Sequence, residues 1–106
     1  MPKYLIQASY TPEGLKGLLK DGGSKRRAVA EETIKGLGGK LEAFYFAFGE
    51  TDAFVIADLP DNASAAAVSM VVNATGAINS KTAVLLTPEE MDKATKKTVS
   101  YRPPGK

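Results

Sequence analysis

The chain contains no cysteine, no histidine and no tryptophan. Without thiols or imidazoles it can form no disulfide, no thiol nucleophile and no Ser-His-Asp triad, and it lacks the usual ligands of zinc, copper and haem iron. A metal site would have to consist of carboxylates, and the sequence has neither an EF-hand loop nor clustered aspartates. We therefore expect no cofactor and no metal.

The chain also lacks a strong charge excess and a long apolar run. Its 14 basic and 12 acidic residues give a net charge of +2 and are dispersed, and no nucleic-acid-binding motif occurs, so we expect no nucleic-acid partner. No segment approaches the roughly 20 apolar residues of a membrane span, and no signal-peptide pattern opens the sequence. These absences predict a cytoplasmic protein with no membrane partner.

What is present is a regular alternation of strand and helix patterns. Strands are predicted over residues 4–10, 41–48, 53–59 and 78–86, and helices over residues 12–21, 24–37, 63–75 and 88–98. This order matches the α+β, ferredoxin-like split βαβ plan with an antiparallel sheet and an extra C-terminal helix. We expect one domain over residues 1–100 and an extended, proline-rich tail over residues 101–106.

The predicted sheet is apolar on both faces, although helices can cover only one of them. Residues 53–57 are all apolar, and three phenylalanines alternate along the neighbouring strand. A sheet buried on both faces needs a second cover, which another copy of the chain can supply as a homodimeric α/β barrel or a larger assembly. The expected interface residues are Phe44, Phe46, Phe48 and Val55. The alternative is a monomer whose final helix folds over the open face.

Several segments together resemble a known family. They are residues 1–4 (MPKY), residues 10–15 (YTPEGL), Arg26, residues 38–41 (GGKL) and residues 49–52 (GETD). Spread over nearly the whole chain, they resemble the GYD-domain family, named for a Gly-Tyr-Asp motif at the hairpin. Gly49 and Asp52 match that motif, whereas Thr51 stands in place of the tyrosine. The resemblance implies a dimeric α/β-barrel protein and assigns no chemistry.

Three cations follow a glycine turn in residues 22–27 (GGSKRR), at the start of a predicted helix with Ser24 as its N-cap. Each exposed cation at a helix N-terminus is unfavourable by about 0.3–1 kcal/mol. Ser24, Arg26 and Arg27 therefore predict a binding site for a small anion. The alternative is an ion pair with a nearby acid such as Asp21 or with an acid of a partner chain.

Two further groups of residues are candidates for chemistry. Asp52 follows the hairpin turn and is a candidate general base, although aspartate also stabilises tight turns through its own backbone. The tyrosines and phenylalanines of the strands predict an aromatic pocket in which Gln7 and Tyr45 supply polar contacts. The alternative is that these aromatic side chains only pack.

These residues support three functions. The first is an oligomeric protein that binds a small anionic or aromatic molecule between Arg26 and the sheet. The second is a cofactor-independent oxygenase or isomerase, of the kind that barrels of related architecture carry, with Asp52 as base and Arg26 as anion clamp. The third is an assembly protein without a ligand. A cavity distinguishes the first two from the third, and turnover distinguishes the second from the first.

Overall fold

The computed structural model describes residues 1–106. Its elements follow the predicted order: β1 (Lys3–Tyr10), α1 (Pro12–Asp21), α2 (Gly23–Gly36), β2 (Lys40–Phe46), β3 (Ala53–Asp58), α3 (Asn62–Ala74), β4 (Ile78–Leu85) and α4 (Pro88–Thr95). None of the four helices has the length and apolarity needed to cross a membrane.

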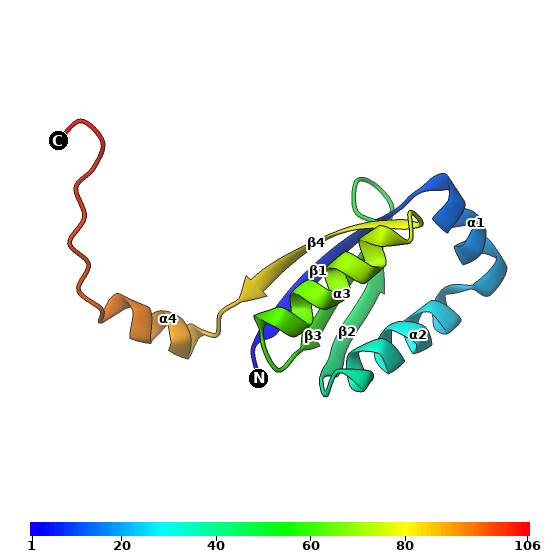
Figure 1. Cartoon of the computed structure of the whole chain (residues 1–106), viewed down its shortest axis with the longest axis horizontal. Helices are drawn as coiled ribbons and strands as arrows, with labels where there is room; N and C mark the ends of the chain where they lie inside the picture. The colour runs from blue at the N-terminus through cyan, green and yellow to red at the C-terminus, as the bar shows by residue number, and fades with distance from the viewer.

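The four strands form one antiparallel sheet in the order β2-β3-β1-β4. This order confirms the predicted ferredoxin-like α+β fold. Helix α2 packs against β2 and α3 packs against β4, so both lie on the same face of the sheet (Figure 1). We call this the covered face and the opposite one the open face.

Side chains cap three of the four helices at their starts. Thr11 caps α1, Asp61 caps α3, and Thr87 and Glu90 form a capping box at the start of α4. Helix α2 differs, because its N-cap is Gly22 and no side chain caps it. The predicted cap at Ser24 is therefore wrong. Gly22, with φ 81°, is both the C-cap of α1 and the N-cap of α2. Ser24 consequently lies inside the first turn of α2.

A β-bulge in β2 changes which side chains face the helices. The pairing with β3 shifts between Leu41 and Ala43, so that Leu41, Phe44 and Phe46 all lie opposite covered-face residues of β3. Gly23 of α2 lies directly over the Phe46 ring. Strict alternation along the strand predicts that Leu41 and Phe44 lie on opposite faces of the sheet. The bulge instead places both on the covered face.

The expected interface residues consequently do not lie on the open face. Phe44, Phe46 and Val55 lie on the covered face, and Val55 is buried. Phe48 lies beyond the end of β2, which stops at Phe46, and is fully exposed. The open face instead carries Leu5, Ala43, Tyr45, Phe54 and Ile56.

The hydrophobic core is small. Only 10 of 106 residues are buried, and the central cluster consists of Tyr4, Ile34, Ala57, Leu59 and Ala65. The Tyr4 hydroxyl in this cluster donates a hydrogen bond to Oδ1 of Asn62 at 2.6 Å. The chain exposes 7714 Å², whereas a folded monomer of 11.2 kDa exposes about 5,700 Å².

The C-terminal arm, residues 88–106, leads away from the sheet (Figure 1). All of its residues are exposed, and α4 packs against no other element. The radius of gyration is accordingly 16.8 Å, against about 13 Å for a compact domain of this length. The final helix therefore does not fold over the open face, as the monomer alternative required.

Candidate functional site

The candidate site begins with an apolar cleft between α2 and α3, above the covered face of the sheet. The cleft measures about 230 Å³, and 12 of its 15 lining residues are hydrophobic. They come from β1, α2, β2, β3, α3 and β4 and include Ile6, Val29, Ala30, Ile34, Phe44, Val55, Val68, Val72 and Ile78. A concave apolar space of this kind, with few polar groups, is typical of small-molecule sites.

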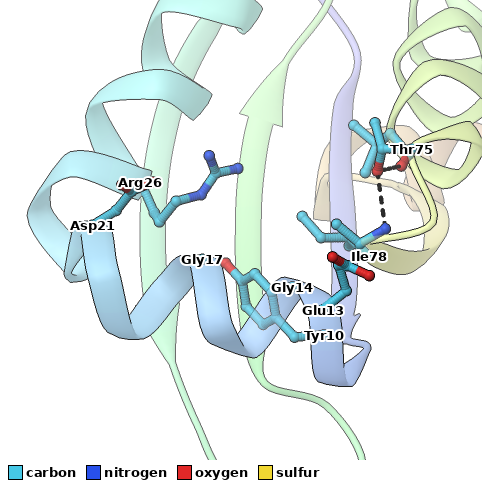
Figure 2. A pocket seen from close by; sticks show the side chains of 10 residues that line it. Tyr10, Glu13, Gly14, Gly17, Asp21, Arg26, Thr75 and Ile78 are labelled. Atoms are coloured by element: carbon cyan, nitrogen blue, oxygen red, sulfur yellow. Dashed lines mark hydrogen bonds between the residues drawn. The ribbon is translucent and has the colours of Figure 1, made fainter.

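A more polar hollow of about 270 Å³ adjoins the cleft at its α1 end, and we call it the mouth. Five residues line both spaces: Tyr10, Arg26, Val72, Thr75 and Ile78. The mouth adds Glu13, Gly14, Gly17 and Asp21 from α1. Figure 2 shows the Arg26 side chain extending from α2 into this opening, with Tyr10 and Glu13 along the α1 side.

Arg26 has no ion-pair partner within the chain. The chain's ion pairs are Lys3–Glu42, Lys3–Asp58 and Lys25–Asp21, so Asp21 pairs with Lys25, at 3.6 Å, and not with Arg26. The half-buried Arg26 side chain also makes no hydrogen bond to another residue. Its guanidinium is free to bind an anion, from a ligand or from a partner chain.

Arg27 and Ser24 lie elsewhere. Both are exposed and line a shallow hollow with Gly23, Phe44 and Phe46. Successive residues of a helix point about 100° apart, so Arg27 projects away from the mouth that Arg26 lines. Of the predicted anion-binding residues, only Arg26 reaches the cleft.

Helix α1 is held close to the loop between α3 and β4, which fixes the wall of the mouth. The Thr11 hydroxyl donates to the carbonyl oxygens of Gly76 at 2.9 Å and Ala77 at 3.2 Å, while accepting from the Gly14 N–H. A Cβ on Gly14 would overlap the Ala77 carbonyl oxygen. Glu13, next to this contact, lines the edge of the mouth with an exposed side chain.

Asp52 fastens the β2–β3 loop to β1. Its Oδ2 accepts from the Tyr10 backbone N–H at 2.8 Å, and its own N–H donates to the Ala8 carbonyl at 2.8 Å. Asp52 lines a hollow beside α1 that does not include Arg26. The structure thus does not bring the candidate base and the anion clamp together, and the enzymatic alternative stays a prediction.

Gln7 and Tyr45 lie on the open face, across the sheet from Arg26. Both pair with Phe54, and Gln7 Oε1 accepts a hydrogen bond from the Thr51 hydroxyl at 3.4 Å. The predicted common site of Arg26, Gln7 and Tyr45 is therefore divided between two faces. Alternation in β1 could have shown this, since Gln7 has the opposite parity to Ile6 and Tyr10.

The open face also has a charged end. Lys3 lies between Glu42, at 2.8 Å, and Asp58, at 2.9 Å. The hydrogen bonds to these carboxylates, from Glu42 first and then Asp58, raise the pKa of Lys3 above its usual value. Farther along the open face, Gln7 and Lys81 lie beside the apolar side chains of Leu5, Tyr45 and Phe54.

The sequence interpretation missed the contribution of α1 to the site. None of the α1 residues that line the mouth, Glu13, Gly14, Gly17 and Asp21, was predicted as part of a binding site. The signal was Gly14 in the first turn of the helix, where the absence of a side chain lets the Ala77 carbonyl approach closely.

Comparison with known proteins identifies one family. The family model of the GYD domain matches residues 4–95, which include the whole sheet, the cleft and the mouth. No curated protein and no solved structure matches the chain. Because the matched segment spans most of the chain, this protein belongs to the GYD domain family.

Proposed function

We propose that the protein binds a small anionic or aromatic molecule in the apolar cleft, with Arg26 as the polar anchor. The observation that carries this proposal is an unpaired guanidinium where the apolar cleft meets the mouth. A charged group that is half-buried without a partner is unfavourable, and an anionic ligand removes that penalty. The surrounding aliphatic and aromatic side chains accept the apolar part of the ligand.

A fluorescent anion tests this proposal. We expect the aromatic sulfonate 8-anilinonaphthalene-1-sulfonate to bind saturably, and Arg26→Gln to weaken its binding about tenfold or more, because a hydrogen bond to a charged group contributes about 1.5–3 kcal/mol. Arg27→Gln is the matched control, since it removes the same charge one residue away. Equal losses in the two variants, or none in either, would contradict the proposal.

We further propose that two copies of the chain associate through their open faces. Leu5, Tyr45, Phe54 and Ile56 form an apolar surface that no helix covers. The Lys3, Glu42 and Asp58 cluster at one end can fix the orientation of the two sheets.

A further inference from the structure

We infer that the ligand is a zwitterion with an apolar substituent, of the class of α-amino acids with aliphatic or aromatic side chains. The inference rests on the proposed binding function of the cleft and specifies its ligand. It depends on three features of the site: charges of both signs at the mouth, the apolar cleft below, and the small size of that cleft.

The mouth presents charges of both signs. Arg26 enters it from α2, while Glu13 and Asp21 line it from α1 (Figure 2). Asp21 is compensated by Lys25, whereas Glu13, whose side chain is exposed, forms no ion pair. A ligand with only a carboxylate would satisfy Arg26 and leave Glu13 facing an anion. A ligand that also carries an ammonium group gives each of the two free charges a partner.

The hydrogen-bonding groups at the mouth also favour a carboxylate beside Arg26. The Thr75 hydroxyl is already used, because it donates to the Val72 carbonyl at 2.8 Å and accepts from the Ala77 N–H at 3.2 Å. The Tyr10 hydroxyl makes no hydrogen bond within the chain and faces the mouth in Figure 2. Tyr10 can therefore bond the ligand carboxylate beside Arg26.

The cleft limits the remainder of the ligand. Its lining beyond the mouth is aliphatic and aromatic, so it accepts a side chain without polar groups. At about 230 Å³ it is smaller than the 300–1,000 Å³ of typical drug-sized pockets. One aliphatic or aromatic side chain suits this space, and a peptide does not.

Three matched compounds test the ligand class by isothermal titration calorimetry on the full chain. They are L-phenylalanine, 3-phenylpropanoate, which lacks the ammonium group, and 2-phenylethylamine, which lacks the carboxylate; L-leucine with 4-methylpentanoate and isopentylamine repeats the comparison. We expect each amino acid to bind at least tenfold more tightly than either of its analogues. Glu13→Gln should remove the advantage over the carboxylate analogue, and Arg26→Gln the advantage over the amine. Glu31→Gln, on the exposed side of α2, is the control.

The outcomes separate this inference from the proposed function. If the carboxylate analogues bind as tightly as the amino acids, the zwitterion inference is overturned and an anion site remains. The inference also fails if no compound of either series binds while the naphthalene sulfonate still depends on Arg26. If the sulfonate does not depend on Arg26, the proposed function fails as well.

Discussion

Gly14 and Gly17 occupy the same helix and differ only in what surrounds them. A Cβ at Gly14 would overlap the Ala77 carbonyl oxygen, whereas a Cβ at Gly17 would meet nothing within 4 Å. Helix propensity alone favours alanine over glycine at both positions by about 1 kcal/mol. The difference in the free energy of unfolding between alanine variants at the two positions therefore measures the packing of α1 against the α3–β4 loop.

We expect Gly14→Ala to lower the free energy of unfolding and Gly17→Ala to raise it by up to about 1 kcal/mol. Urea unfolding at one fixed protein concentration measures both, because self-association would otherwise shift the midpoint. If Gly14→Ala stabilises the protein as much as Gly17→Ala, α1 does not approach Ala77 as closely as described.

Asp61 links the stability of α3 to pH. Its carboxylate accepts a hydrogen bond from the Ser64 backbone N–H at 2.8 Å, which lowers its pKa below the ordinary 3.8. Because the pKa is lower in the folded state, the stabilisation is complete above the unfolded value and is lost as pH falls through the folded one. Asparagine caps helices about as well as aspartate but does not titrate in this range.

We therefore expect wild-type protein to lose stability relative to Asp61→Asn as the pH is lowered from about 5 to about 1. Thermal unfolding of the two proteins across this range gives the comparison, and the other carboxyl groups cancel in the difference. Parallel curves for the two proteins would show that the Asp61 cap contributes no pH dependence.

At the scale of elements, the sequence predicted the strands and helices well and the faces of β2 poorly. Helices α1, α3 and α4 each carry a local signal at their capping residue, so their starts could be predicted. The bulge between Leu41 and Ala43 carries no such signal, because one unpaired residue changes the pairing without changing the hydrophobic pattern. A simple count of alternate residues along β2 therefore assigns the side chains beyond the bulge to the wrong face of the sheet.

Helix α4 is the element with the least support. It has 8 residues, packs against nothing, and is held mainly by the reciprocal hydrogen bonds between Thr87 and Glu90 at 3.0 and 3.1 Å. Isolated helices shorter than about 12–15 residues are marginal in water. The stability of α4 thus depends on whether another chain covers it.

In dilute protein, we expect the amides of α4 to exchange with deuterium almost as fast as those of unstructured peptide. Peptides from α3 in the same digest, followed by mass spectrometry, are the internal control and should exchange much more slowly. Slow exchange in α4 at every concentration would mean that another surface binds the arm.

At the scale of the whole molecule, the unpartnered open face was predictable and its residues were not. The apolar character of β3 on both faces indicates that a second cover is needed. Which side chains of β2 face the second cover depends on the register of β2 with β3, and the bulge sets that register. The position of the C-terminal arm was not predictable either, since an amphipathic pattern does not say which surface the helix covers.

The open-face proposal predicts a change in mass on mutation. Phe54→Glu places a charge in the middle of the proposed interface, so we expect light scattering after size-exclusion chromatography to show a shift from dimer or larger assembly to monomer. Phe48→Glu is the control, because Phe48 is 100% exposed and lies outside the sheet. Identical masses for wild type and Phe54→Glu would refute the proposed interface.

The register of β1 with β4 also decides how the protein can be handled. Lys3 pairs with Leu85 at one end of the sheet, and Tyr10 pairs with Ile78 at the other. The N-terminal residues and the start of the C-terminal arm therefore lie at the end of the sheet that is far from the mouth. An affinity tag or biosensor anchor attached to the N-terminus would therefore leave the mouth facing the solution. Captured protein should accept small molecules with the same affinity as free protein.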